Sequence, residues 1–242
     1  MYYYILEAPQ SRATRQTYQR LRDILTQLSI AGEIVSSSPA RTPTELAEMG
    51  ARKGYSTIVA VGGDHHVNEV ARSVIGNAEL GVVPIEASRL VTDIIGVNDI
   101  KSAAVALKQR RLSLVNTVVI EPDTLLFLDC EINTNKLAKI SIVLDNKLRA
   151  YAYFNRLTIN RNLELTLESV HETETKKILG LFTVGSEQIK SQSRFHARNV
   201  RIVTDPVLPL TVAGKPIAET PLHLRLVSDS LKIITKRGTL LE

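Results

Sequence analysis

The sequence is poor in aromatic residues and almost free of cysteine. Its 242 residues include no Trp, and Phe, Tyr and Trp together make up 5%. Proteins that bind single-stranded nucleic acid stack its bases on aromatic rings, so a nucleic-acid partner is not expected. The single cysteine, Cys130, excludes a disulfide within the chain and favours a reducing compartment.

Long apolar runs and charged tails are also missing. No stretch reaches the roughly 18–20 apolar residues that a membrane-spanning helix needs. The first residues, MYYYILEAP, lack the basic segment that is typical of a signal peptide. We therefore expect a cytoplasmic protein. The net charge of +5 would attract phosphates, nucleotides or anionic lipid surfaces without identifying any of them.

The composition is that of a folded protein, and strands alternate with helices in the first half. The apolar fraction is 44%, which is enough for a core of normal size. The expected strands of this half are Tyr2–Leu6, Glu33–Ser37, Thr57–Val61 and Leu80–Pro84, and the expected helices are 13–31, 42–53, 66–75 and 99–110, with Gly32 ending the first. Such alternation predicts an α/β domain with a parallel sheet.

After about residue 115 the pattern changes to strands with few helices between them. The expected strands are Val118–Ile120, Leu125–Cys130, Ile140–Leu144, Tyr151–Ile159, Asn162–Glu168, Leu179–Val184, Val200–Thr204, Leu208–Ala213, Leu222–Val227 and Leu231–Thr235. A run of strands after a run of βα units predicts a separate all-β domain. We therefore predict an α/β domain over 1–116 and a β-rich, sandwich-like domain over 117–242, whose last strand is a candidate for returning to the first domain.

Residues 57–70, TIVAVGGDHHVNEV, combine a buried strand, a Gly-Gly-Asp turn and the start of a helix. Such a turn directs backbone N–H groups toward an anion, and glycine lets the backbone approach a phosphate closely. Asp64 could hold a Mg²⁺ ion that bridges phosphates, or accept a proton from an attacking hydroxyl. The alternative is that Gly62 and Gly63 only form a tight turn and Asp64 caps the helix.

The turn lies in a longer pattern, in which VGGDHHVNEV is followed by LGVVP, then by IIGVND and an alanine-rich helix. This pattern resembles the diacylglycerol kinase catalytic family, which includes bacterial lipid kinases and sphingosine kinases. The resemblance covers most of 1–116 and extends weakly into the second half. It implies an α/β nucleotide-binding domain, a β-sandwich-like domain and an active site between them, a plan that NAD kinases share. Pro84, after Leu80 and Gly81, favours the lipid-kinase branch over the NAD kinases.

The family pattern is kept at the turn and lost at the residues around it. Gly62, Gly63, Asp64, Asn68 and Glu69 match the family's Gly-Gly-Asp and Asn-Glu positions, whereas His65 and His66 replace its Gly-Thr pair. The resemblance therefore implies a bulky ring where a phosphate would lie.

Three other family loops depart further from the pattern. The Gly-Thr-Gly-Asn-Asp loop falls on 86–90, which includes Arg89 and matches at no position. The Asn-Pro-x-Ser-Gly loop falls on 8–12 and keeps only its Pro and Ser11. The Val-Asp-Gly-Glu hairpin falls on 212–215, where both carboxylates are lost and Lys215 ends the motif. Phosphoryl transfer depends on positioning and charge neutralisation, so these losses favour catalytic degeneracy.

The candidate site combines the matched and the replaced positions. The expected nucleotide-binding residues are Gly62, Gly63, Asp64, His65, His66, Asn68, Glu69, Ser11, Arg89 and Lys215, and Asp64 is the catalytic candidate. The two histidines could bind a metal together with Asp64, but the sequence offers no further ligand nearby, and two partly exposed loop histidines are the simpler interpretation. We therefore predict no resident metal site.

Three hypotheses follow. The first is a catalytically degenerate lipid-kinase-like protein that binds a nucleotide, a lipid or a partner in the cleft between its domains. The second is an active ATP-dependent lipid kinase with an altered site, which would require ATP and Mg²⁺. The third is an interaction protein that keeps only the fold. The candidate partners are a nucleotide or lipid ligand, a peripheral membrane surface and a second copy of the chain.

Overall fold

The computed structural model describes residues 1–122, 124–172 and 188–236. The expected strand Leu179–Val184 lies outside these residues. The described chain divides into two compact units: residues 1–117, 124–128 and 227–236 form the first, and residues 118–122, 129–172 and 188–226 form the second. Within the described residues, no helix is long and apolar enough to cross a membrane.

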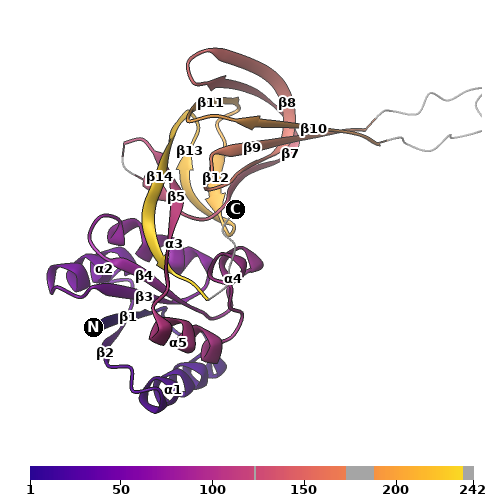
Figure 1. Ribbon diagram of the computed structural model, residues 1–242. Helices are drawn as coiled ribbons and strands as arrows, with labels where there is room; N and C mark the ends of the chain where they lie inside the picture. Colours follow the sequence, from indigo (N-terminus) through magenta and orange to yellow (C-terminus); the bar gives the residue numbers. More distant parts are fainter. Residues whose placement is uncertain (123, 173–187, 237–242) are drawn as a thin grey trace, which may run out of the picture. The chain divides into compact units, whose positions relative to one another are not determined.

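The first unit is built on a parallel sheet with helices on both faces (Figure 1). The strands β1 (Tyr2–Leu6), β2 (Gly32–Ser36), β3 (Thr57–Gly62) and β4 (Glu79–Pro84) have the order β2-β1-β3-β4, and the C-terminal part of β14 (Leu222–Ile234) runs parallel to β4. Every residue of β3 is buried, as the unbroken apolar run predicts for an inner strand of a parallel sheet.

Five helices accompany this sheet: α1 (Arg12–Gln27), α2 (Pro43–Arg52), α3 (Asp64–Val74), α4 (Arg89–Ile95) and α5 (Ile100–Gln109). Figure 1 shows α2 and α3 together on one side of the sheet and α1 and α5 together on the other. Thr42 and Glu45 form a complete capping box at the start of α2, which confirms the expectation for this helix.

Two expectations about helices are wrong. The first helix ends at Gln27, and Gly32 opens β2 instead of ending the helix. Gly32 is needed there because a Cβ would lie 2.5 Å from the carbonyl oxygen of Tyr2 on the neighbouring strand. Helix α4 was not expected at all, because its seven residues are too few to show a helical repeat.

The second unit consists of antiparallel strands. The strands not yet bounded are β5 (Leu112–Ile120), β6 (Thr124–Leu126), β7 (Cys130–Leu144), β8 (Leu148–Ile159), β9 (Glu164–Glu172), β10 (Gln188–His196), β11 (Asn199–Asp205), β12 (Pro209–Val212) and β13 (Lys215–Glu219), of which β6 and most of β5 belong to the first unit. The order is β10-β9-β8-β7-β11-β14, and β12 and β13 form a hairpin. The predicted fold class, a parallel α/β part followed by a largely antiparallel β part, is confirmed.

The strands of the second half differ in detail from the expectation. The two runs 222–227 and 231–235 belong to one long strand, β14, in which Asp229 has a φ of 50°. The run 125–130 is divided between the end of β6 and the start of β7. Strands β10 and β13 were not expected, because only Ile189 and Phe195 are apolar in β10 and because β13 is short and contains Pro216.

Candidate functional site

The Gly-Gly-Asp turn lies at the carboxyl end of β3, in the first unit. Gly62 is the last residue of β3, Gly63 is the N-cap of α3, and the helix begins at Asp64. Gly63 has no side chain that could accept a hydrogen bond, so the first N–H groups of α3 need acceptors from elsewhere. This is the geometry that binds anions at helix N-termini.

The acceptor at this turn is the side chain of Glu7. Glu7 directly follows β1, and the parallel register of β1 and β3 places it beside Gly62. Its Oε2 accepts a hydrogen bond from the N–H of Gly63 at 2.8 Å. A Cβ on Gly62 would lie 2.5 Å from the same oxygen, so Gly62 leaves the space that the carboxylate fills. A carboxylate of the chain itself therefore occupies the position expected for a phosphate.

Asp64 connects the turn to the loop that follows β4. Its Oδ1 accepts a hydrogen bond from the N–H of Ser88 at 2.7 Å. The alternative that Asp64 caps its own helix is wrong, because Gly63 occupies the N-cap and Asp64 is the first helical residue. Ser88 in turn caps α4 through its hydroxyl, which accepts from the N–H of Leu90.

The two histidines lie in the first turn of α3 and differ in exposure. His66 is 2% exposed, and its Nε2–H donates to the carbonyl oxygen of Ile5 at 2.9 Å. Burial lowers the pKa of its imidazole, so the neutral form is favoured. His65 is partly exposed, with its Nε2 3.6 Å from Oε1 of Glu69. The expectation of two partly exposed loop histidines is wrong for His66, because α3 begins at Asp64 and directs it inward.

Asn68 is buried and has a structural role within the first unit. Its Oδ1 accepts hydrogen bonds from the backbone N–H groups of Phe127 at 2.9 Å and Leu128 at 3.4 Å. The side chain is 2% exposed. The match of Asn68 to the family motif is therefore accounted for by the fixation of the segment that follows β6.

Ser11 and the loop after β4 are linked through Thr14. Ser11 caps α1 by accepting from the N–H of Thr14 at 3.0 Å, and the hydroxyl of Thr14 donates to Glu86 at 3.1 Å. A Cβ on Gly63 would lie 3.4 Å from the backbone oxygen of Glu86, so this loop borders the turn. Three carboxylate residues, Glu7, Asp64 and Glu86, thus lie at or beside the turn, and the sequence analysis missed Glu7.

The two basic candidates are exposed. Arg89 is the first residue of α4 and belongs to the first unit, whereas Lys215 opens β13 in the second unit. Across the described ranges, no three His, Cys, Asp or Glu side chains are grouped so that they could hold a metal ion.

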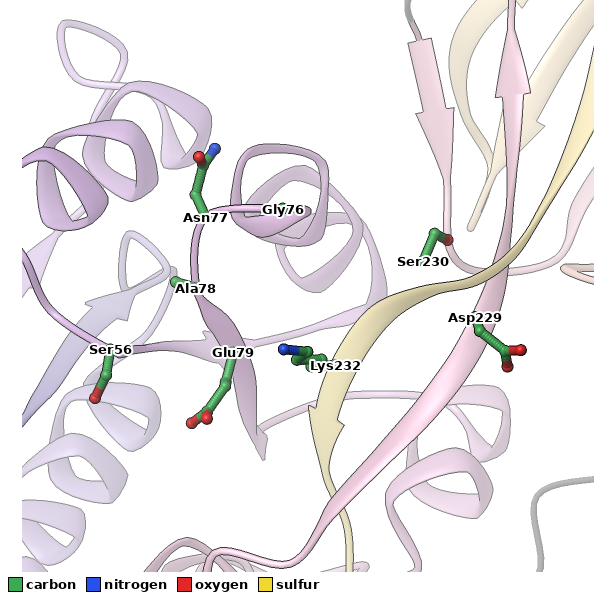
Figure 2. A pocket seen from close by; sticks show the side chains of 8 residues that line it. All are labelled: Ser56, Gly76, Asn77, Ala78, Glu79, Asp229, Ser230 and Lys232. Carbon is green, nitrogen blue, oxygen red and sulfur yellow. The ribbon is translucent and has the colours of Figure 1, made fainter.

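A separate hollow of about 280 Å³ lies in the first unit, and Figure 2 shows the side chains that line it. It lies where β3 and β4 begin, at the opposite end of these strands from the Gly-Gly-Asp turn. Its lining residues are Ser56, Gly76, Asn77, Ala78, Glu79, Asp229, Ser230 and Lys232. None of the predicted site residues is among them. Glu79 is bound by Arg110 at 2.8 Å and by the hydroxyl of Thr57 at 2.9 Å, so its charge is compensated within the unit.

The chain is similar to known proteins in sequence family and in fold. Residues 6–119 match the model of the diacylglycerol kinase catalytic domain. A crystal structure of a diacylglycerol kinase from Bacillus anthracis has a TM-score of 0.72 at 13% identity, covering 99% of this chain and 98% of that one. Another crystal structure from the same organism has a TM-score of 0.76 at 13% identity, covering 98% of both chains.

A more distant similarity is to an NAD kinase from Archaeoglobus fulgidus in complex with ATP. Its TM-score is 0.56 at 10% identity, and the match covers 99% of this chain and 95% of that one. The TM-scores of these matches show a shared fold, and at identities of 10–13% they show the fold alone. A sequence comparison with curated proteins gave no match. The matched segment includes the Gly-Gly-Asp turn, its flanking strands and the helices around it, and through residues 6–119 the chain is a member of the diacylglycerol kinase catalytic domain family.

Proposed function

We propose that this protein is a catalytically degenerate member of the lipid-kinase family, with a binding or regulatory role in place of phosphoryl transfer. The observation that carries the proposal is the hydrogen bond from the N–H of Gly63 to the carboxylate of Glu7 at 2.8 Å. A phosphate at this turn would have to displace a side chain that already provides the negative charge favoured at a helix N-terminus.

Charge around the turn supports the same proposal. Two like charges about 4 Å apart near a protein surface repel by roughly 4 kcal/mol. A phosphate bound at Gly63 would approach Glu7 directly, and Asp64 and Glu86 add further negative charge nearby. The residues present therefore do not fit the phosphates of ATP unless a cation neutralises them.

The C-terminal hairpin adds a further reason. The resemblance places two acidic positions of the family on Ala213 and Lys215, so neither can coordinate Mg²⁺. Phosphoryl transfer requires positioning and charge neutralisation, which these substitutions remove. The ligand of such a degenerate member would be a lipid, a nucleotide held without its phosphates at the turn, or another protein.

An active ATP-dependent lipid kinase with an altered site is the alternative. It is favoured by the presence of Asp64 at the end of β3, where its second carboxylate oxygen remains available for a proton or a metal ion. In this alternative Arg89 and Lys215 would neutralise phosphates. The similarity of the fold to an NAD kinase in complex with ATP is compatible with it.

Lipid phosphorylation distinguishes the two functions. The wild-type protein and Asp64→Asn would be incubated with labelled ATP, Mg²⁺ and detergent micelles that contain diacylglycerols or sphingoid bases. The proposal predicts no labelled lipid above the level of the Asp64→Asn control. A labelled lipid that the wild type forms and Asp64→Asn does not would overturn the proposal and establish the kinase alternative.

A further inference from the structure

The antiparallel sheet of the second unit has one face that carries exposed tyrosines. In β8, Tyr151 and Tyr153 lie opposite Ser141 and Lys139 of β7. In the same register, Arg149 of β8 lies opposite Val143. Side chains alternate between the two faces of a strand, so these residues share one face, and the buried Ile140 and Ile142 lie on the other.

Strand β11 continues the same face. Val203 lies opposite Ser141, and Arg201 lies opposite Val143. We call the resulting surface the tyrosine face and define it by Lys139, Arg149, Tyr151, Tyr153, Arg201 and Val203. All six belong to the second unit.

The tyrosine face exposes large apolar groups that a sheet normally buries. Tyr151 is 71% exposed, Tyr153 is 53% exposed and Val203 is 52% exposed. Single exposed apolar residues are ordinary, but a contiguous group of them is typical of an interaction surface.

The charge of the face is positive. Lys139, Arg149 and Arg201 are exposed, and the acidic residue in the same rows is Asp205, opposite Lys139. The guanidinium of Arg149 donates to the hydroxyl of Tyr151 at 3.2 Å, so a cation lies beside the most exposed ring. The face thus presents aromatic rings, aliphatic side chains and guanidinium groups together.

We propose that the tyrosine face docks on an anionic lipid bilayer. Tyrosine rings are favoured at the boundary between headgroups and acyl chains, because the ring is apolar and the hydroxyl remains hydrated. Guanidinium groups bind lipid phosphates, and each basic residue near an anionic surface adds to the attraction. Val203 provides aliphatic surface that can enter the interface. This inference is independent of whether the Gly-Gly-Asp turn binds a nucleotide.

The other occupants of such a face fit less well. Single-stranded nucleic acid gains from aromatic stacking, to which the aliphatic Val203 adds nothing. In a two-fold symmetric dimer, the same positively charged patch would face its own copy, which like charges disfavour. An anionic bilayer matches the aromatic, the aliphatic and the basic residues at once.

Vesicle co-sedimentation tests this docking with the full chain. Vesicles of phosphatidylcholine alone are compared with vesicles that also contain phosphatidylserine. Arg149→Glu/Arg201→Glu is compared with Arg20→Glu/Arg22→Glu, which makes the same charge change at exposed positions of α1. Tyr151→Ser/Tyr153→Ser removes the rings without changing the charge.

The wild type is expected to bind only the vesicles with phosphatidylserine, and added salt should weaken this binding. Arg149→Glu/Arg201→Glu should weaken it roughly tenfold or more, and Tyr151→Ser/Tyr153→Ser should weaken it at constant charge, while the α1 control binds as the wild type does. Equal loss in the α1 control, or no vesicle binding by the wild type, would overturn the proposal. Binding of a labelled oligonucleotide in place of vesicles would also overturn the proposal. A dimer of the wild type that Arg149→Glu/Arg201→Glu dissociates would overturn it as well.

Discussion

The carboxyl end of the parallel sheet and the outer face of the antiparallel sheet differ in how their exposed groups are used. At the carboxyl end, the N–H groups of Gly63 and Ser88 are bonded by the carboxylates of Glu7 and Asp64. On the tyrosine face, large side chains and guanidinium groups lie in solvent. The first region carries the family motif and is occupied by the chain itself. The second carries no motif and is open to a partner.

This comparison shows that a residue can match the family motif without belonging to a binding site that is free for a ligand. Asn68 matches the family pattern, yet its side-chain oxygen accepts hydrogen bonds from Phe127 and Leu128 and so holds the segment after β6. Gly62 also matches, and the space beside it is filled by Glu7. Both residues are explained by the fold alone, so their presence does not require phosphoryl transfer.

Asn68→Ala should have the largest effect on stability. It leaves the buried N–H groups of Phe127 and Leu128 without their acceptor, and each such loss costs about 1–3 kcal/mol. We expect a loss of about 3 kcal/mol in the free energy of unfolding, measured by urea denaturation. Glu69→Ala, at the adjacent position where 26% of the side chain is exposed, should change it by less than about 0.5 kcal/mol. Equal effects would show that Asn68 does not fix this segment.

Gly62→Ala and Gly63→Ala test the space beside the turn. A Cβ on Gly62 would lie 2.8 Å from the Cβ of Glu7, whereas the nearest atom to a Cβ on Gly63 is 3.4 Å away. Overpacking costs about 1–3 kcal/mol, so Gly62→Ala should be destabilised by about 2 kcal/mol and Gly63→Ala much less. Thermal denaturation of the two variants measures the difference. The reverse order would contradict the position of Glu7.

Tyr4→Phe and Tyr18→Phe should change stability in opposite directions. Within the described residues, the buried hydroxyl of Tyr4 has no hydrogen-bond partner, whereas the hydroxyl of Tyr18 donates to the backbone oxygen of Glu7 at 2.7 Å. Removing an unsatisfied buried hydroxyl should stabilise the protein by about 1 kcal/mol, and removing the bonded one should destabilise it by a similar amount. The urea concentrations at the midpoint of unfolding, measured for the wild type and both variants, check the sign of each change in stability.

The pH dependence of stability should report the burial of His66. Burial lowers its folded-state pKa below the unfolded value, so as the pH falls the unfolded chain takes up the proton first. The stability that depends on neutral His66 is therefore complete above roughly pH 6.5 and decreases below it. In His66→Gln, this contribution to the change of the free energy of unfolding with pH should disappear. An unchanged slope between the wild type and the variant would contradict a neutral, buried imidazole.

The smallest change in stability is expected on the tyrosine face. Tyr151→Ser/Tyr153→Ser alters side chains that are more than half exposed, so the free energy of unfolding should stay within about 0.5 kcal/mol of the wild type. Denaturation of this double variant checks the value. A loss as large as that of Gly62→Ala would show that the two rings are packed, and the contrast between the two regions would disappear.

Much of the fold was predictable from local patterns. The unbroken apolar run of β3, the capping box of α2 and the change from alternating strands and helices to strands alone each follow from nearest neighbours in sequence. Helix α4 was missed because it is short, and β14 was divided because Ser228, Asp229 and Ser230 resemble a turn.

The occupation of the turn was not predictable in the same way. Glu7 and Gly63 are 56 residues apart, and they meet because β1 and β3 are neighbours in parallel register. A carboxylate directly after the first strand was the available signal, but its meaning depends on strand order. The burial of His66 likewise depends on where α3 begins. Sequence alone therefore located the turn but not its occupant.

Calorimetric titration of the protein with Mg-ATP tests the central claim most directly. The wild type, Glu7→Ala and Asp64→Ala would be titrated at millimolar ATP. If the carboxylate of Glu7 blocks the turn, the wild type gives no binding heat, and Glu7→Ala, which frees the N–H of Gly63, gains measurable binding. Binding of Mg-ATP by the wild type that Asp64→Ala weakens would contradict the account and show that the Gly-Gly-Asp site is functional.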